Sequence, residues 1–155
     1  MKALWAPWRQ PFVMRSPGKG CLFCKARRSR DDKRAWVVHR GKYAMVMLNL
    51  YPYNNGHIMV VPYRHVSKFS RLKDNELLEI WRLVERFMKK LDQKIHPHGY
   101  NVGLNLGRVA GAGVPGHMHV HIVPRWNADT NMMPVIGQTK VISASLQSLY
   151  RMLKK

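Results

Sequence analysis

Three histidines alternate with apolar residues in the segment His117-Met-His-Val-His121. Successive side chains along a β-strand point to opposite faces, so this spacing predicts that the three imidazoles project together while Met118 and Val120 face the core. A lone strand histidine is usually structural, but three in strict alternation suggest a common ligand or reaction. Two chemistries fit: three ligands to a catalytic metal, or one nucleophilic imidazole supported by two others.

Glycines are frequent just before this segment, in the order Gly103, Gly107, Gly111, Gly113 and Gly116. Glycine lets backbone N–H groups approach an anion closely. The segment 107–116 is therefore predicted to be a loop that contacts phosphate oxygens.

The only two cysteines, Cys21 and Cys24, form a Cys-x-x-Cys pair. We expect a cytoplasmic protein, because the N-terminus lacks a secretory signal and no stretch approaches the roughly 18 apolar residues of a membrane span. A disulfide would not persist there, so the spacing suggests a metal knuckle or a redox pair. Two cysteines supply half of a tetrahedral zinc shell, and only the eight histidines could complete it.

The chain is strongly basic, with 27 Lys and Arg against 8 Asp and Glu and a formal net charge of +19. Such a charge attracts anions over long range, and phosphates are the obvious candidates. No basic-aromatic repeat or docking motif accompanies it, so nucleic acid is a conceivable partner but not a favoured one.

Short apolar runs predict the strands that must position these residues. Residues 35–39 and 43–50 flank Arg-Gly-Lys and indicate a hairpin, and the run 51–56 is typical of a turn. Further strands are predicted at 57–62, 101–106 and 117–124.

Two helices are predicted. Between Asp74 and about Lys94, apolar residues recur at three- and four-residue steps behind an Asp cap. The face comprises Leu77, Leu78, Trp81, Val84, Phe87, Met88 and Leu91. A second helix, roughly Ser143 to Lys154, carries Leu146, Leu149 and Leu153 on one side. The strands surround a long helix and do not alternate regularly with helices along the chain. This pattern indicates an α+β fold on a mostly antiparallel sheet of about five strands.

At 155 residues the chain is long enough for one ordinary domain and too short for two. We predict a single domain over residues 1–155. It would comprise an N-terminal arm (1–20), a core (21–126) and a C-terminal tail with its helix (127–155).

Two segments carry a family resemblance. Gly116-His-Met-His-Val-His-Ile-Val-Pro-Arg-Trp126 resembles the signature of the histidine triad superfamily, whose members are nucleotide hydrolases and transferases. Residues 48–65, Leu-Asn-Leu-Tyr-Pro-Tyr-Asn-Asn-Gly-His-Ile-Met-Val-Val-Pro-Tyr-Arg-His, are similar to the nucleoside-binding strand pair of that family. Together with the intervening helix the resemblance spans residues 21 to about 137 and implies the family's HIT-like fold.

The resemblance implies that His119 is a nucleophile that attacks the α-phosphorus of a nucleotide and forms a nucleotidyl-histidine intermediate. His117 and His121 would flank it as the other catalytic histidines. A neutral imidazole is a competent nucleophile near pH 7. Stabilisation of phosphate charge is expected from the glycine loop, Asn105 and His121. The predicted substrate-binding residues are Asn49, His57, Asn105 and Gly113.

The resemblance also supplies two further metal ligands. Zinc-bearing members complete a Cys-x-x-Cys pair with a histidine after the Val-Val-Pro strand and with the first triad histidine, here His65 and His117. The implied site, Cys21, Cys24, His65 and His117, has no open position, so its zinc would be structural. The alternative is a reduced cysteine pair without metal. We expect His39, His96 and His98 on the surface.

Residues 124–136 resemble the tail of the branch that splits dinucleoside polyphosphates such as diadenosine tetraphosphate, by hydrolysis or phosphorolysis. Two positions depart from the pattern. Val114 replaces a frequent hydroxyl residue, which leaves the phosphate contact to backbone groups or Arg108, and Met132 replaces a frequent aromatic residue.

Two other functions compete with cleavage of dinucleoside polyphosphates. One is a phosphoramidase-like nucleotide hydrolase, and the other is a non-catalytic protein that binds nucleotides or nucleic acid. Family members generally form homodimers, and the apolar helix 74–94 offers a plausible interface. No membrane association is expected.

Overall fold

The computed structural model describes residues 20–130 and 140–154. Its sheet has five strands in the order β1-β2-β3-β5-β4, and every neighbouring pair is antiparallel. The strands are β1 (Val37–Arg40), β2 (Ala44–Leu48), β3 (Ile58–Pro62), β4 (Gly99–Gly103) and β5 (Val120–Arg125). The helices are α2 (Leu22–Arg28), α3 (Asp32–Ala35), α4 (Asp74–Ile95) and α6 (Leu146–Lys154), with a 3-10 turn at Phe69–Arg71. The predicted α+β class and antiparallel sheet are confirmed.

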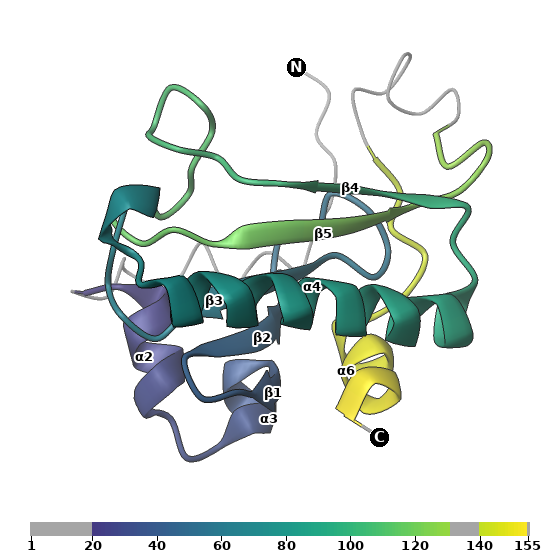
Figure 1. The fold of residues 1–155 in the computed structure, drawn as a ribbon. Helices are drawn as coiled ribbons and strands as arrows, with labels where there is room; N and C mark the ends of the chain where they lie inside the picture. The colour runs from purple at the N-terminus through teal and green to yellow at the C-terminus, as the bar shows by residue number, and fades with distance from the viewer. Residues whose placement is uncertain (1–19, 131–139, 155) are drawn as a thin grey trace, which may run out of the picture.

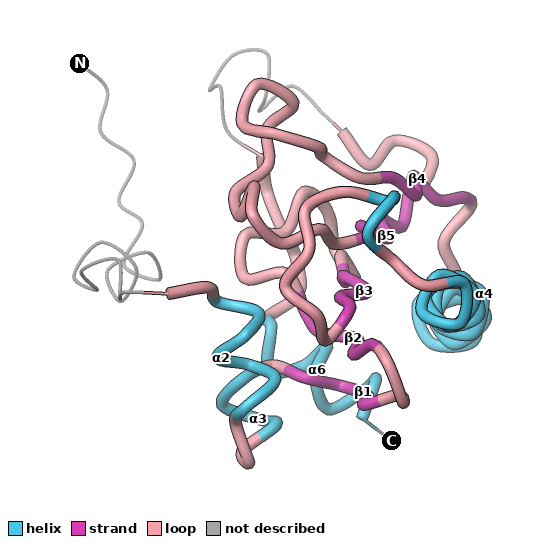
Figure 2. The backbone as a smooth tube through the Cα atoms, turned by 60° about the vertical axis from the view of Figure 1, so that its left-hand side comes forward, coloured by secondary structure: helices cyan, strands magenta, loops and turns pink. Residues whose placement is uncertain are grey.

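The sheet separates two groups of helices. The long helix α4 lies along one face, and α2 and α3 lie on the other side (Figures 1 and 2). On the α4 side, Ile80, Phe87 and Leu91 are buried together with sheet residues such as Val60 and Ile122. Leu149 and Leu153 of α6 join the same core, as their predicted face requires.

A second core lies on the α2 side of the sheet. There Phe23 and Ala26 of α2 pack with Met45, Met59 and Val61. Adjacent strand residues such as Val60 and Val61 belong to different cores because side chains alternate faces along a strand. The same alternation places His119 and His121 opposite the core residues Val120 and Ile122.

Strand β5 begins later than predicted. It starts at Val120, so His117 and His119 precede the strand and only His121 lies within it. The backbone before β5 pairs elsewhere, because the Met118 amide donates to the Val66 carbonyl at 2.7 Å. Strand β4 is also displaced from its predicted range of 101–106, beginning at Gly99 and ending at Gly103.

Two short helices, α2 and α3, were not predicted. With seven and four residues, neither is long enough to show a helical repeat of apolar residues. Ala35, assigned to the first strand by its sequence, ends α3, and Trp36 then takes a left-handed conformation with φ 57°. The chain therefore turns once more before β1 begins.

The long helix confirms the predicted range but not its details. Its N-cap is Lys73 rather than Asp74, and the Lys73 amide donates to the Glu76 carboxylate at 2.8 Å. Leu78 and Trp81, assigned to the apolar face, are 51% and 45% exposed. Helix α6 begins at Leu146, three residues after the predicted Ser143.

None of the described helices combines the length and apolar character that a membrane span requires. Two predicted features lie partly outside the described residues: the N-terminal arm as far as residue 19, and residues 131–136 of the segment that resembles the branch tail, including Met132.

Candidate active site

His119 is held in one tautomer by the backbone. Its Nδ1 lies 3.0 Å from the His117 carbonyl, which can only accept, so Nδ1 carries the proton and Nε2 retains a lone pair. The side chain is 5% exposed, and burial lowers its pKa while the bond to the carbonyl opposes this. A neutral imidazole with a free Nε2 is the form that can attack phosphorus.

His57 and His121 form a directed hydrogen-bond chain. The Tyr53 amide donates to His57 Nδ1 at 3.0 Å, so the proton of a neutral His57 is on Nε2. That N–H donates to His121 Nδ1 at 2.9 Å, which places the His121 proton on its own Nε2. Burial, followed by the neighbouring imidazoles, lowers the pKa of His57 to about 3 and that of His121 to about 4. Both rings are therefore neutral at pH 7.

The chain of donors ends at His121 Nε2. This atom is buried and has no hydrogen-bond partner among the described residues. A buried donor left unpaired costs about 1–3 kcal/mol, so its presence in a folded protein calls for a ligand acceptor. The ring centroids of His119 and His121 are 4.7 Å apart. A free lone pair and a free N–H are thus adjacent, which suits attack on a phosphate whose oxygen accepts a hydrogen bond.

Phe23 is a residue of this site that the sequence reasoning missed. It lies in α2, is 1% exposed, and its ring centroid is 4.8 Å from that of His119 and 5.3 Å from that of His117. Its position between Cys21 and Cys24 was the sequence feature that could have identified it. Because its ring contacts two triad histidines, the position of α2 restricts how His119 can move.

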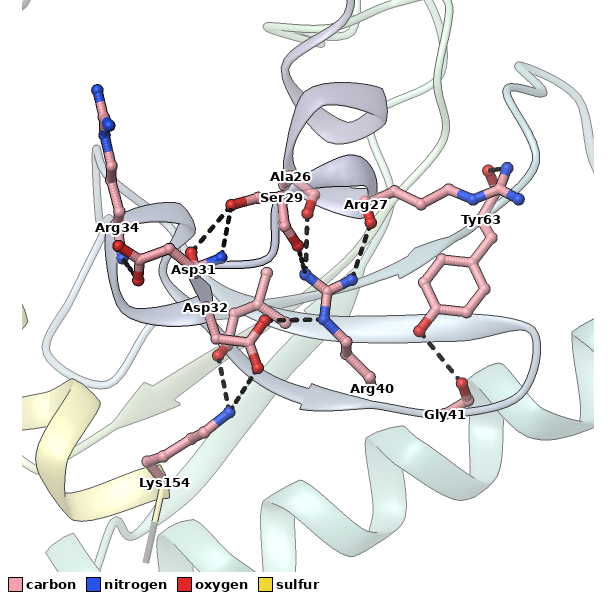
Figure 3. A network of polar contacts seen from close by, with 11 residues as sticks. Ala26, Arg27, Ser29, Asp31, Asp32, Arg34, Arg40, Gly41, Tyr63 and Lys154 are labelled. Atoms are coloured by element: carbon pink, nitrogen blue, oxygen red, sulfur yellow. Dashed lines mark hydrogen bonds and ion pairs between the residues drawn. The ribbon is translucent and has the colours of Figure 1, made fainter.

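Arg40 of β1 fixes α2 against the sheet (Figure 3). Its guanidinium donates to the carbonyls of Ala26, Arg27 and Ser29 at 2.9–3.0 Å, and to Asp32 at 2.8 Å. Carbonyls at the C-terminal end of a helix have no partner within the helix, so this planar cation serves as a cap from another element. Lys154 of α6 also binds Asp32, at 2.7 Å.

The predicted substrate-binding residues divide into two groups. Asn49 lies beside His57, with Nδ2 3.3 and 3.4 Å from its two ring nitrogens, while Oδ1 accepts from the Tyr51 amide at 2.9 Å. Asn105 and Gly113 belong to the loop before the histidines. Asn105 donates to the Gly111 carbonyl at 3.5 Å, so it stabilises the loop, and Gly113 is exposed. Asn49 and His57 are thus beside the triad, whereas Asn105 and Gly113 form no hydrogen bond to it within the described part of the chain.

The glycines of this loop have a backbone role. Gly107 and Gly111 adopt φ values of 86° and 85°, which residues with a Cβ rarely take. Val114, the residue that departs from the family pattern, is half-buried against the second core and carries no hydroxyl for a phosphate. Backbone N–H groups and the exposed side chain of Arg108 are therefore the donors that this loop offers to an anion.

Four residues far apart in the sequence meet in a cluster that could hold a metal. The ligand atoms of Cys21, Cys24, His65 and His117 all lie within 4.8 Å of one another. His117 Nδ1 is 3.3 Å from Cys21 Sγ and 3.7 Å from Cys24 Sγ, and His65 Nδ1 is 3.4 Å from Cys24 Sγ. Tetrahedral zinc with ordinary Zn–S and Zn–N lengths separates sulfur from nitrogen by about 3.5 Å. The donor set and its spacing therefore fit zinc.

The tautomer of His117 suits this role. Its Nε2 lies 2.8 Å from the Pro62 carbonyl and must donate to it, so Nδ1 presents a lone pair to the cluster. The carbonyl of the same residue accepts from His119. His117 therefore joins the candidate metal site to the candidate nucleophile through its own backbone.

Of the remaining histidines, two are on the surface as predicted. His96 and His98 are exposed, although His98 Nδ1 accepts from the Asn127 amide at 2.9 Å. The prediction for His39 was wrong, since it is half-buried and its ring centroid is 5.8 Å from that of Phe87. Its strand face is covered by α4, which the local sequence cannot reveal.

Comparison with known proteins identifies the class that this fold and site define. The HIT domain family model matches residues 30–128, and the chain belongs to the histidine triad family. It is 40% identical, over 99% of this chain and 83% of the relative, to an AP-4-A phosphorylase of Mycobacterium tuberculosis. It is also 31% identical to an asymmetrical bis(5'-nucleosyl)-tetraphosphatase of Schizosaccharomyces pombe, over 74% of this chain and 63% of that protein.

A solved structure has the same fold. It is a zinc-bound histidine triad family protein from Mycobacterium smegmatis, with a TM-score of 0.68 and 20% identity over 87% of this chain and 91% of that one. At this identity the likeness supports the fold alone.

Proposed function

We propose that this protein cleaves dinucleoside polyphosphates such as diadenosine tetraphosphate at the α-phosphate, through a nucleotidyl-histidine intermediate on His119. The observation that carries the proposal is the pairing of a free lone pair on His119 Nε2 with the unpartnered N–H of buried His121. The substrate class is supported by the 40% identity to an AP-4-A phosphorylase over nearly the whole chain.

The first step forms a bond between His119 Nε2 and the α-phosphorus and breaks the bond from that phosphorus to the bridging oxygen. With diadenosine tetraphosphate, ATP leaves and AMP remains on the histidine. The positive charge that develops on the imidazole is stabilised by the bond from its Nδ1 to the His117 carbonyl. His121 Nε2 donates to a non-bridging phosphate oxygen, because the chain from Tyr53 through His57 keeps its proton there.

The second step frees His119. Inorganic phosphate attacking the intermediate releases ADP, and water releases AMP. We assign Asn49 to the ribose. The phosphates are assigned to the 107–116 loop, which contains Gly113, and to Asn105, which bonds to this loop at the Gly111 carbonyl. The net charge of +19 suits a substrate that carries several phosphate charges.

Cys21, Cys24, His65 and His117 are the residues that would hold zinc, which when bound supplies a structural crosslink rather than a reacting group. That crosslink would fix α2 and His117 together. Phe23 and the His117 carbonyl both contact His119, so the crosslink would also hold the His119 ring in its position.

We further propose that the protein forms a homodimer through the side of the molecule that carries β4 and α4. Strand β4 is at the edge of the sheet, where its outer backbone groups are available for pairing. On α4, Leu78 and Trp81 are exposed apolar side chains without a core to cover them. Sedimentation of the wild type and of Trp81→Glu tests this proposal, and a monomeric wild type would contradict it.

The activity is tested by incubating purified protein with diadenosine tetraphosphate, with and without inorganic phosphate, and resolving the products. ADP plus ATP formed only with phosphate identifies a phosphorylase. AMP plus ATP without phosphate identifies an asymmetrical hydrolase, and two ADP would contradict attack at the α-phosphate. If neither tube shows product, a nucleoside phosphoramidate tests the phosphoramidase alternative, and no turnover of either substrate would leave only the binding function.

A further inference from the structure

A group of cations projects from the α2–α3 segment. It comprises Lys25, Arg27, Arg28, Arg30, Lys33 and Arg34, all exposed. Within the described ranges 20–130 and 140–154, none of them forms an ion pair. The acidic residues of the segment are occupied: Asp31 caps α3 by accepting from the Arg34 amide, and Asp32 binds Arg40 and Lys154.

One of these cations, Arg27, also borders a cavity of about 410 Å³. The cavity lies where the β1–β2 turn, the end of β3 and the start of α4 meet. Its cationic lining residues are Arg27, Lys42, Arg64 and Lys73. Glu76 also lines it, but its carboxylate is bound by Arg64 at 2.5 and 2.7 Å.

Two further carboxylates, Glu79 and Asp74, lie near the cavity. Glu79 accepts from the Tyr43 amide at 3.1 Å. Asp74, in the first turn of α4, is exposed and adds one negative charge at the rim. The neutral Tyr43 amide does not cancel the charge of Glu79, so Arg27, Lys42, Arg64 and Lys73 face the carboxylates of Asp74, Glu76 and Glu79, and the cavity keeps an excess of one positive charge.

Aromatic rings line the same cavity. Tyr43 and Tyr63 are half-buried, Lys42 Nζ lies 5.2 Å from the Tyr43 ring centroid, and the Arg27 guanidinium lies 5.5 Å from that of Tyr63. Figure 3 shows Arg27 extending toward Tyr63 while Arg34 points away from the Arg40 network in another direction. Arg27 donates to the Tyr63 carbonyl at 3.0 Å but has no carboxylate partner among the described residues. Aromatic rings beside cations without ion pairs are the features that bind bases and backbone phosphates of single strands.

We infer that these residues form a binding surface for single-stranded nucleic acid, distinct from the histidine site. We call it the cationic surface and define it as Lys25, Arg27, Arg28, Arg30, Lys33, Arg34, Lys42 and Lys73. A small phosphate compound could occupy the cavity, but it would leave the charges of α3 without a partner. The extent of the surface therefore favours a polymer, whose successive phosphates contact both the cavity and the α2–α3 segment. None of these residues belongs to the triad or to the candidate metal cluster.

The test is fluorescence anisotropy of a labelled single-stranded oligonucleotide of about 12 nucleotides, a length typical of such sites, across a range of salt concentrations. Two double variants remove equal charge. Lys42→Ala/Lys73→Ala acts on the cavity, and Lys89→Ala/Lys94→Ala acts on the C-terminal half of α4. The cavity variant is expected to bind at least about tenfold more weakly and to lower the slope of log affinity on log salt by about 1.4, or 0.7 per lost phosphate contact. The control variant is expected to bind as the wild type does.

A third variant, Arg30→Ala/Arg34→Ala, tests the extension along α3 and is expected to weaken binding by a similar factor. Equal losses in the cavity and control variants would show an unspecific charge effect and overturn the inference. If the third variant binds as tightly as the wild type, the site is only a cavity for small phosphates, and the inference is overturned as well. Absence of binding by the wild type at physiological salt would also overturn the inference.

The inference is independent of the proposed catalysis. Saturating AMP, which occupies the histidine site, is expected not to displace the oligonucleotide, and displacement would contradict a separate surface. Turnover of diadenosine tetraphosphate by the Lys42→Ala/Lys73→Ala variant shows that it is folded. If the wild type turns over diadenosine tetraphosphate but does not bind the oligonucleotide, the surface is rejected and the proposed reaction still stands.

Discussion

Replacement of His57 tests whether the hydrogen-bond chain sets the tautomer of His121. In His57→Leu the donor to His121 Nδ1 is lost, and an unpaired buried acceptor costs about 1–3 kcal/mol. His121 can avoid that cost by other tautomers or hydrogen bonds, but its proton is then no longer fixed on Nε2. The reaction loses one oriented donor to the phosphate oxygen, for which a decrease in kcat of about 100-fold or more is typical.

The matched control is His57→Gln. A glutamine amide can accept from the Tyr53 amide through its oxygen and donate to His121 Nδ1 through its nitrogen, so it retains both functions of the imidazole. We expect it to recover at least about tenfold of the lost kcat, with KM changed little in either variant, since the donor acts mainly in the transition state.

Steady-state kinetics on diadenosine tetraphosphate measures both parameters. A kcat for His57→Leu within about threefold of the wild type would refute a role for the chain in transition-state stabilisation. Equal activities of the leucine and glutamine variants would show that packing, rather than hydrogen bonding, is what His57 contributes.

Four further predictions concern the site and its supports. His119→Ala is expected to abolish turnover while nucleotide affinity, measured by calorimetry, stays within a few fold; comparable turnover would reject the nucleophile. Cys24→Ser is expected to lose zinc, and a full equivalent by elemental analysis would refute the metal site. Arg40→Met removes the cap of α2 and is expected to lower the free energy of unfolding by about 2 kcal/mol in urea titrations, whereas no change would contradict the capping role. Folding lowers the pKa of His57 to about 3 and of His121 to about 4, so the unfolded chain binds more protons as pH falls below about 6.5. Stability should therefore decrease toward acid by up to about 1.4 kcal/mol per pH unit for each ring, and a slope unchanged in His57→Leu would argue against this origin.

The sequence predicted the elements whose periodicity is local. The three-and-four spacing from residue 74 gave α4 within one residue of its ends, because burial against a sheet selects one face of a helix. The apolar runs before residue 63 likewise predicted β2 and β3, since each is buried over its full length. The family resemblance named four candidate metal ligands, and the structure brings all four together.

The helix and strand bounds that were not predicted correctly have a common cause: they depend on contacts with residues that are distant in the sequence. Helix α2 has seven residues and is capped by Arg40, which lies beyond α3 in the chain. Nothing in its own sequence therefore predicts where it ends. The start of β5 was misplaced because the Met118 amide bonds to Val66, some fifty residues earlier, instead of to a neighbouring strand in regular register.

By itself the sequence determined which side chains are available and which can share a face: the alternating histidines, the cysteine pair and the apolar stripes of the helices. Only the tertiary structure decided their chemical state. The lone pair on His119 Nε2 depends on the carbonyl of His117, and the proton on His121 Nε2 depends on the Tyr53 amide acting through His57. A tautomer is set by the donors and acceptors around a ring, and the bond from His57 to His121 that completes this chain joins the residue before β3 to a residue of β5, two strands that meet only when the protein folds.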